Sequence, residues 1–445
     1  MDQSPREAVA RVLPSVREDL ERLVRIPSVS SDPAAAAQVQ ASAEAVADLL
    51  RGEGLIDVDI LTVDGGQPAV VGHRPAPPGA PTVLLYAHHD VQPTGESTAW
   101  DSDPFEPVER DGRLYGRGAA DDKAGIALHL AALRAYGDQL PVGVVVIVEG
   151  EEEIGSPTLA TFLYTYSERL RADVVVLADS TNWTVDVPAL TTTLRGGVNL
   201  AVEVATLDHG VHSGMYGGVA PDALTALCRL LATLHDEQGN VAVAGLARGP
   251  APDLDLSDEQ FRADAGMLDG VEFIGTGRIT ERLWSGPAIS VTAVDAPPVA
   301  AAANVLLPTA RAMVSLRVAP GDDAGRAGKA LAEHLKSHAP WGAQVTVSAK
   351  SAMPGYPGHT GGRAYDAAHW AFGEAWGTPA VDMGVGGTIP FIAAFAEVMP
   401  DAEILVTGVE DPDTRAHGAN ESLHLAMFER ACVAEVLLLE RLAAP

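Results

Sequence analysis

Acidic and histidine residues follow four apolar runs of this sequence, each at the point where the run ends. The runs and the polar residues behind them are Thr82–Ala87 with His88, His89 and Asp90, Val142–Val148 with Glu149 to Glu153, Asp173–Ala178 with Asp179, and Ile404–Thr407 with Glu410, Asp411 and later His417. Imidazole and carboxylate ligands together suit zinc and its first-row neighbours. Because ligands at the carboxyl ends of strands meet in one crevice of an open α/β sheet, the sequence predicts a two-metal site.

The first of these groups is His88-His89-Asp90. A histidine that binds a metal commonly donates its other ring nitrogen to a carboxylate, which fixes the tautomer. We therefore expect His88 to be a ligand and Asp90 to orient it. Side chains alternate along a strand, so His89 is expected on the opposite face, although periodicity leaves the swapped register open.

Two acidic clusters have both a structural and a chemical explanation. Asp121-Asp122 follows Gly116-Arg-Gly-Ala-Ala and opens a helical pattern, where aspartates commonly cap the helix. Alternatively, one of them bridges two cations that lie about 3.5–4 Å apart. The run Glu151-Glu152-Glu153 is either a solvated charge cluster or a ligand beside a general base.

Other kinds of catalytic site find little support. The chain has no Gly-x-Ser-x-Gly motif, and Cys228 and Cys432 lie in apolar, helix-like stretches. Gly384-Val-Gly-Gly387 follows no clear strand, so it fails as a dinucleotide-binding fingerprint. His417 lies in a polar loop, and His212 lies in a glycine-rich loop at 208–218. Each of these two histidines is either a surface residue or part of a site.

Strand-like runs alternate with helical patterns over residues 58–180, which predicts an α/β domain with a mostly parallel sheet. Helices are expected at 5–25, 36–53, 122–137 and 156–170. From about residue 190 the pattern becomes β-α-β-β-α-β, as in a ferredoxin-like unit. Its predicted elements are a strand at 198–204, a helix at 221–237, an irregular insertion at 239–270, strands at 288–294 and 310–318, a helix at 322–338 and a strand at 343–350.

This organisation predicts a catalytic domain in two parts, residues 1–190 and 353–445, with an inserted domain at 191–352. The inserted α+β domain would act as a lid or a dimerisation module. The segment after about residue 239, up to 285, carries no motif that assigns it a role.

The net charge of −30 over 445 residues argues against nucleic acid and anionic membranes as partners. Two cysteines do not make a disulfide framework. The charged N-terminus shows no secretory signal, and no apolar run approaches the ~18 residues that a membrane span requires. We therefore expect a cytoplasmic protein.

In this order, the motifs resemble those of the dinuclear-zinc metallopeptidase family of aminoacylases, carboxypeptidases and carnosinase-type dipeptidases. The resemblance spans essentially the whole chain, and the residues within its motifs favour the dipeptidase branch of the family. It departs from the family at Ala87, where glycine is frequent, and at His89, where the residue is usually small or apolar. The motifs that carry the resemblance are Tyr86-Ala-His-His-Asp-Val-Gln-Pro93, Gly116-Arg-Gly-Ala-Ala-Asp-Asp-Lys123, Gly150-Glu-Glu-Glu-Ile-Gly-Ser156 and Gly386-Gly-Thr-Ile-Pro390.

The resemblance implies a role for each site residue and two Zn²⁺ ions per subunit, with Mn²⁺ or Co²⁺ as other possible metals. The implied metal ligands are His88, Asp121, Glu153, Asp179 and His417, with Asp121 bridging. Glu152 would be the general base, Asp90 would orient His88, and His212 of a partner subunit would stabilise the oxyanion. Substrate would contact Arg317, Asn304, Gly386, Gly387 and Thr388. The peptide bond between Asp121 and Asp122 would be cis.

The implied reaction is hydrolysis of an amide bond in dipeptides or similar small substrates with a free C-terminal carboxylate. The protein would be a homodimer joined through the inserted domain. An N-acetyl- or N-succinyl-amino-acid deacylase is the nearest alternative, and a carbamoyl-amide hydrolase is another. Outside the enzymes, an inactive metal-binding homologue is the competing hypothesis.

Overall fold

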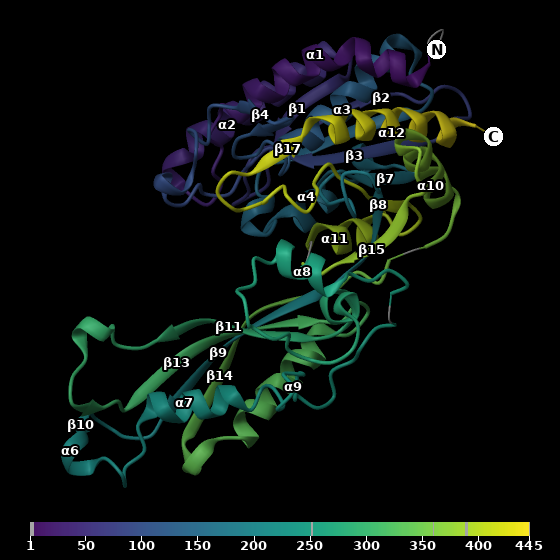
Figure 1. Ribbon diagram of the computed structural model, residues 1–445. Coiled ribbons are helices and arrows are strands. Elements are labelled where there is room, and N and C mark those ends of the chain that lie inside the picture. The colour runs from purple at the N-terminus through teal and green to yellow at the C-terminus, as the bar shows by residue number, and fades with distance from the viewer. Residues whose placement is uncertain (1–3, 251, 359, 388–389, 445) are drawn as a thin grey trace. The chain divides into compact units, whose positions relative to one another are not determined.

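The computed structural model describes residues 4–250, 252–358, 360–387 and 390–444. The chain forms two compact units (Figure 1). Unit 1 comprises residues 1–192, 359–383 and 390–445, and unit 2 comprises residues 193–358 and 384–389. No helix among the described residues is both long and apolar enough to cross a membrane.

A six-stranded mixed sheet, in the order β1-β2-β6-β3-β7-β16, forms the centre of unit 1. The four strands from β6 to β16 are parallel, and β1 and β2 are antiparallel, so the predicted parallel arrangement holds for the part that carries the site. The strands are β1 (Ile56–Leu61), β2 (Ala69–Arg74), β3 (Thr82–His88), β6 (Gly143–Glu149), β7 (Val174–Leu177) and β16 (Glu403–Val406).

Helices cover both faces of this sheet. On one face, α3 packs on β3 and also contacts α1 and α12 (Figure 1). Leu85 and Ala87 of β3 belong to the apolar core on this face. On the other face, the Tyr86 ring lies 4.4 Å from that of Phe391 in α11. The helices of unit 1 are α1 (Pro5–Val24), α2 (Ala36–Gly52), α3 (Lys123–Tyr136), α4 (Leu159–Thr165), α5 (Ser167–Leu170), α10 (Arg363–Trp376), α11 (Pro390–Val398) and α12 (Leu425–Ala443).

Two predictions made from the sequence are wrong. The helix expected at 156–170 is two short helices, α4 and α5, because Ser156 has a positive φ of 50° and Tyr166 leaves the helical region between them. Glu151 also binds the N–H and hydroxyl of Thr158 at 2.7 Å, which ties the segment before α4 to the acidic loop. A strand does precede Gly386, namely β15 (Val381–Val385), which pairs with β8 (Ala189–Leu194).

Short strands complete the sheet structure near the site. β4 (Val108–Arg110), β5 (Arg113–Tyr115) and β17 (Ser422–His424) form an antiparallel sheet in the order β17-β5-β4. This sheet joins the segment before Gly116 to the segment after His417.

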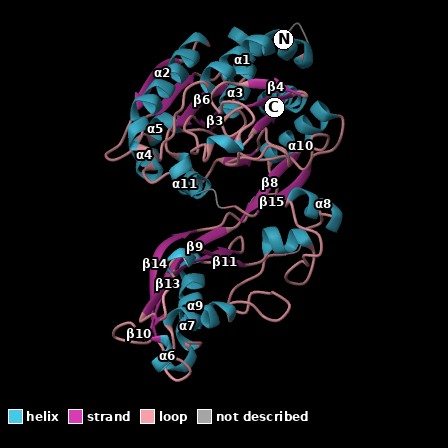
Figure 2. Ribbon diagram, turned by 60° about the vertical axis from the view of Figure 1, so that its left-hand side comes forward, coloured by secondary structure: helices cyan, strands magenta, loops and turns pink. Residues whose placement is uncertain are grey.

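Unit 2 has a four-stranded antiparallel sheet in the order β11-β13-β9-β14, with α7 and α9 on one face (Figure 2). Alternate residues of β9 and β13, such as Val202 and Val314, pack beneath these helices, whereas the other face is largely exposed. The elements are β9 (Gly196–Ala205), α7 (Ala223–Ala232), β11 (Ala288–Asp295), β13 (Thr309–Val318), α9 (Ala324–Ser337) and β14 (Gln344–Met353). Their order along the chain is β-α-β-β-α-β.

The remaining elements of unit 2 are short. β10 (Val211–His212) and β12 (Val305–Leu306) form a two-stranded antiparallel sheet beside α6 (Ser213–Tyr216). Among the described residues between α7 and β11 lies the helix α8 (Asp258–Asp264), within the insertion at 239–270 that the sequence predicted to be irregular.

Candidate metal centre

The parallel strands of unit 1 deliver acidic and histidine side chains to one place. His88 is the last residue of β3, the Glu151–Glu153 loop follows β6, and Asp179 follows β7. The loop after β16 carries Glu410 and then His417. Since these four strands are neighbours and parallel, their ends lie at the same edge of the sheet, as the sequence predicted.

Asp121 lies at the centre of this group. Its Oδ1 is 3.1 Å from Nε2 of His88, and its Oδ2 is 3.0 Å from Nε2 of His417. Nε2 of His417 is also 3.2 Å from Oε2 of Glu153. Nε2 of His88 is 3.9 Å from Oδ1 of Asp179. All five predicted ligands therefore lie together, and one carboxylate faces a histidine with each of its oxygens.

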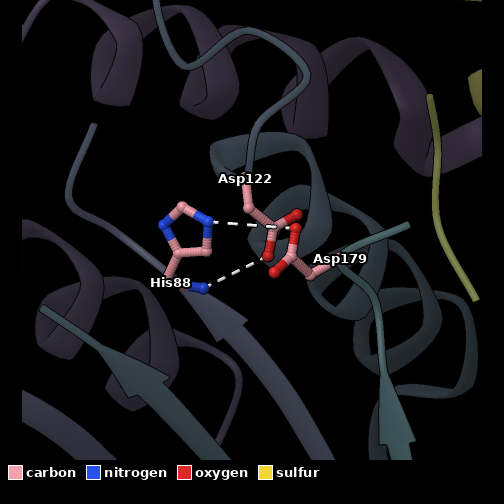
Figure 3. A group of neighbouring side chains, drawn as sticks. All are labelled: His88, Asp122 and Asp179. Atoms are coloured by element: carbon pink, nitrogen blue, oxygen red, sulfur yellow. Dashed lines mark hydrogen bonds and ion pairs between the residues drawn. The ribbon is translucent and has the colours of Figure 1, made fainter. Parts of the chain in front are cut away.

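Asp122 is also close to this group, as Figure 3 shows with His88 and Asp179. Its two oxygens, however, already accept hydrogen bonds from the backbone N–H groups of His88 and Gly125, both at 3.2 Å. Asp122 is thus the N-cap of α3 and also holds the end of β3. The peptide bond between Asp121 and Asp122 is cis, as the resemblance implied.

Asp90 connects His88 to the acidic loop. Nδ1 of His88 lies 3.1 Å from the Asp90 carbonyl oxygen and 3.4 Å from its Oδ1. The Asp90 carboxylate also accepts hydrogen bonds from the N–H groups of Glu152 and Glu153, at 3.2 and 3.1 Å. Asp90 therefore holds both His88 and the turn that carries the two glutamates.

Glu152 lies beside the ligand group, with Oε2 4.0 Å from Nε2 of His88. Burial, reinforced by the Asp179 carboxylate, raises the pKa of Glu152 well above its ordinary value. Burial also raises the pKa of Asp179 to about 7, against the opposing effect of His88. The pKa of Glu410 is raised by burial and by the charges of Asp121 and Asp179. Carboxylates this crowded remain ionised together only when cations offset their repulsion.

His89 belongs to a different environment. It is fully buried, and its Nε2 lies 2.9 Å from the carbonyl oxygen of Pro68. Burial lowers the pKa of His89 to about 4, so its ring is neutral. Its contacts support the expectation that it points away from the metal ligands.

A buried ion pair positions the two loops that carry Asp121 and His417, and the sequence analysis missed it. Arg117 donates a 2.6 Å hydrogen bond to Glu421, and both side chains are almost completely buried. Glu421 accepts from the N–H groups of Ala120 and Asp121, each at 3.1 Å. Arg117 also donates to the carbonyl oxygen of His417 at 3.1 Å. The sequence offered one sign of this ion pair, namely an arginine between two glycines in a loop with no acidic residue beside it.

The other predicted site residues belong to unit 2. His212 is exposed, and its backbone pairs with Val305 in the β10–β12 sheet. The N–H of Ser213 donates to the carbonyl oxygen of Asn304 at 2.9 Å, so His212 and Asn304 lie close together. Arg317 lies on β13, and Thr388 lies outside the described residues.

Arg195 is a second residue that the sequence analysis missed. It is 8% exposed, and its Nε donates to the carbonyl oxygen of Gly386 at 3.1 Å. A Cβ on Gly386 would lie 2.7 Å from Nη2 of Arg195 and 3.0 Å from the carbonyl oxygen of Leu283, so a larger residue here would force its neighbours to shift. Burial and the nearby charge of Arg317 lower the pKa of Arg195 to about 10. Two arginines and Gly386 thus lie in one part of unit 2.

Comparisons with known proteins agree on one family. The profile of peptidase family M20/M25/M40 matches residues 84–441. A cysteinylglycine-S-conjugate dipeptidase of Corynebacterium striatum is 36% identical over 425 residues, which cover 94% of this chain and 93% of that protein. A β-Ala-His dipeptidase of Homo sapiens is 27% identical over 380 residues, covering 80% of this chain and 74% of that protein.

Two solved structures share the fold along nearly the whole chain. The structure of the dipeptidase Dug1p from Saccharomyces cerevisiae has a TM-score of 0.84 and 22% identity, covering 99% of this chain and 98% of that one. Human carnosine dipeptidase 1 also has a TM-score of 0.84, with 24% identity and the same coverage of both chains.

Proposed function

The chain belongs to peptidase family M20/M25/M40, and from that membership we propose that it is a dipeptidase that uses two divalent metal ions. Membership makes it a hydrolase of the metallopeptidase class. Its substrates are dipeptides with a free C-terminal carboxylate. The names of its relatives point to cysteinylglycine, its S-conjugates and β-alanylhistidine as the first substrates to test.

The observation that carries this proposal is the position of Asp121 between two histidines, 3.1 Å from His88 and 3.0 Å from His417. A carboxylate placed in this way can give one oxygen to each of two ions. The donor set of two imidazoles and three carboxylates suits zinc, and Mn²⁺ and Co²⁺ accept the same ligands. The raised pKa values of Asp179 and Glu152 also indicate a site that needs positive charge.

In this proposal His88 and Asp179 would hold one ion, Glu153 and His417 would hold the other, and Asp121 would be shared by both. When bound, the ions would polarise the substrate carbonyl and lower the pKa of a water molecule towards ~7. Gln92 steadies Glu153, because its backbone N–H and side-chain amide donate to the two Glu153 oxygens at 2.9 and 2.8 Å.

Glu152 serves as the general base. It accepts the proton of the attacking water and then delivers it to the nitrogen of the leaving amine. Its backbone is fixed by Asp90, which keeps the carboxylate beside His88, and no residue that the structure describes donates a hydrogen bond to that carboxylate. A base must be free to take and release a proton, and Glu152 meets that requirement.

Unit 2 supplies substrate recognition. Arg317, with Gly386, Gly387 and Thr388, binds the C-terminal carboxylate, since a guanidinium recognises a carboxylate through paired hydrogen bonds. His212 stabilises the oxyanion, and Asn304 contacts the substrate beside it. The 2.9 Å hydrogen bond from Ser213 to Asn304 supports a joint role for these two positions.

We also propose that unit 2 forms a homodimer, with His212 acting on the metal centre of the partner subunit. The surface around His212 carries exposed apolar side chains that a second copy would bury. They are Met215, Val219 and Val305, which are 75, 94 and 45% exposed.

A substrate panel tests the proposed reaction. The protein is loaded with zinc, manganese or cobalt and offered cysteinylglycine, S-benzyl-cysteinylglycine, β-alanylhistidine, N-acetyl and N-succinyl amino acids, and an N-carbamoyl amino acid. We expect metal-dependent hydrolysis of the dipeptides that a chelator abolishes. Preferential hydrolysis of the N-acyl or N-carbamoyl substrates would replace the dipeptidase proposal with a deacylase or a carbamoyl-amide hydrolase. No hydrolysis by a metal-loaded protein would favour an inactive homologue.

A further inference from the structure

Unit 2 contains a cavity of about 460 Å³ that the proposed reaction does not use. It lies between the first residues of β11 and the segment that precedes this strand, which includes α8. Its volume is within the range of small-molecule binding sites, roughly 300–1,000 Å³. All of the lining residues belong to unit 2.

The wall of the cavity is mainly apolar. Phe261, Val271, Phe273, Ile274 and Ile289 contribute side chains to it. The rings of Phe261 and Phe273 pack edge to face, with centroids 5.6 Å apart. Such a surface favours a ligand with an apolar body, because burying that body removes apolar area from water.

Hydrogen bonds hold this wall in place. The N–H of Gly275 donates to the carbonyl oxygen of Gln238 at 2.6 Å, and the N–H of Thr276 donates to Asn240 at 2.8 Å. Gly239 has a φ of 81°, and a Cβ there would lie 2.7 Å from Ile274. The turn after α7 and the segment before β11 are therefore closely packed, so contacts within the fold define the wall of the cavity.

Three arginines also line the cavity, namely Arg195, Arg248 and Arg282, together with one acid, Glu272. None of the three arginines makes an ion pair with a carboxylate of the described residues. This is unusual in a chain with 60 acidic and 30 basic residues, where arginines such as Arg113 and Arg134 contact carboxylates at 2.8 and 2.7 Å. Arg195 is the most unusual of the three, because a buried charge without a counter-charge is costly.

The hydrogen bonds of Arg195 leave part of its guanidinium available. Nε and Nη1 donate to the carbonyl oxygens of Gly386, Arg282 and Gly286, whereas Nη2 donates to no described residue. Arg248 is exposed and has no hydrogen-bond partner in the described part of the chain. Guanidinium groups with free N–H donors pair readily with a carboxylate or a sulfonate.

We propose that this cavity binds a small organic anion with an apolar body, at a site separate from the metal ligands. The apolar wall takes the body, and the arginines take the anionic group. The site needs neither metal ions nor hydrolysis, so it can be tested apart from the proposed function. Arg195 also donates a hydrogen bond to the carbonyl oxygen of Gly386. An anion bound to Arg195 would therefore contact a residue that positions the backbone at Gly386.

The test uses 8-anilinonaphthalene-1-sulfonate, whose fluorescence rises in apolar surroundings, and N-phenyl-1-naphthylamine, which has the same rings without the sulfonate. Titration of the folded, metal-loaded protein should give one sulfonate-dye site per chain. The uncharged dye should bind more weakly, by roughly tenfold, because it lacks the charged hydrogen bonds.

Two variants locate the dye. Val271→Trp places an indole at the cavity wall and should weaken sulfonate binding by at least about tenfold. Arg248→Ala removes an exposed charge without disturbing a hydrogen bond and should weaken it roughly fivefold, as expected for one partly screened charge. Lys329→Ala is the matched control, since Lys329 is an exposed cation of α9 outside the cavity.

Arg195→Gln tests the buried charge directly, and its fold is checked by thermal unfolding. If it fails to fold, Val271→Trp and Arg248→Ala still decide the question. Equal binding of both dyes, or unchanged sulfonate binding in both of these variants, would overturn the proposal. So would the absence of any saturable dye site in the wild-type protein.

Discussion

A single carboxylate, that of Asp121, faces both histidines of the candidate site, at 3.1 and 3.0 Å. Its backbone N–H is held by Glu421, so the side chain projects from a fixed point. Its pKa is held below the ordinary value by His417 and His88, although burial acts in the opposite direction. Asp121 is therefore ionised over the whole physiological range and suited to be shared by two cations.

Glu152 is the residue whose role is easiest to separate from metal binding. Replacing Glu152 by Gln removes the base and keeps the shape, so turnover should fall by ~10²–10⁴ while the metal content stays the same. Steady-state kinetics and elemental analysis of the same samples measure both quantities. Glu168→Gln, an exposed change on α5, is the control. Undiminished hydrolysis by Glu152→Gln would rule out the assigned role.

The family resemblance named the five residues that gather at the site, whereas the sequence patterns alone placed acidic and histidine residues at the ends of four strands and left the role of His417 open. They could not separate Asp121 from Asp122, since both open the same helix. Only the fold shows that the carboxylate oxygens of Asp122 already accept hydrogen bonds from the N–H groups of His88 and Gly125. Glu421 was missed because its partner Arg117 is 304 residues away in the chain.

At the scale of the elements, Arg117 and Glu421 connect the loop before α3 to the loop before β17 and thereby hold the two loops in position. Glu421→Gln keeps the size of the side chain and removes its charge. We expect this change to weaken metal binding about 10–100-fold, most strongly for the ion near His417, as for other groups that orient ligands. Competition with a chelator measures the affinity.

A purely structural role for Glu421 would give a different result. The variant would then lose thermal stability but bind both metal ions as tightly as the wild type. Glu403→Gln, at the start of β16 in the same unit, is a matched control, because Glu403 binds the N–H of Ala364 and not the metal loops.

The packing of α3 on α12 contains a buried pair, in which Nδ1 of His129 lies 2.9 Å from Glu435. Burial lowers the pKa of His129, but the carboxylate more than offsets this and raises it above about 6.5. The pair's contribution to stability is therefore fully present below about pH 6.5 and is lost as the pH rises through the raised pKa.

Glu435→Gln should lower the free energy of unfolding by about 3 kcal/mol near pH 6, because it leaves a buried histidine without its counter-charge. The difference from the wild type should shrink as the pH rises towards 9. Urea denaturation at several pH values measures it, with the exposed Glu440→Gln as control. A difference that does not change with pH would contradict this account of the pair.

Long amphipathic patterns predicted the elements well, as for α1 and α9, whose apolar residues recur at helical spacing. Prediction failed where tertiary contacts decide the conformation. The pattern of residues 156–170 is helical, yet Thr158 donates a hydrogen bond to Glu151 and the helix begins only after Thr158. The strand β15 was overlooked because its partner β8 lies about 190 residues earlier in the chain.

At the scale of the whole molecule, the proposed dimer makes a distinctive prediction. His212→Ala lacks the oxyanion donor but keeps the general base, and Glu152→Ala lacks the general base but keeps the oxyanion donor. Each variant alone should be nearly inactive. If His212 acts across the dimer, refolding an equal mixture should restore about a quarter of the wild-type activity, because half of the dimers are mixed and each has one complete site.

Sedimentation of the same samples shows whether the refolded chains are dimers, half of which are mixed when the two variants associate at random. An inactive mixture that sediments as a dimer would mean that His212 does not act in the partner subunit. An active, strictly monomeric wild-type protein would exclude the dimer itself.

Anomalous diffraction from metal-loaded crystals is the most direct measurement of the metal centre. Data are collected at the absorption edge of the metal that elemental analysis identifies. We predict two peaks about 3.5–4 Å apart, one beside His88 and Asp179 and the other beside Glu153 and His417, with one oxygen of Asp121 on each. A single peak, or two peaks that do not share Asp121, would contradict the two-metal account.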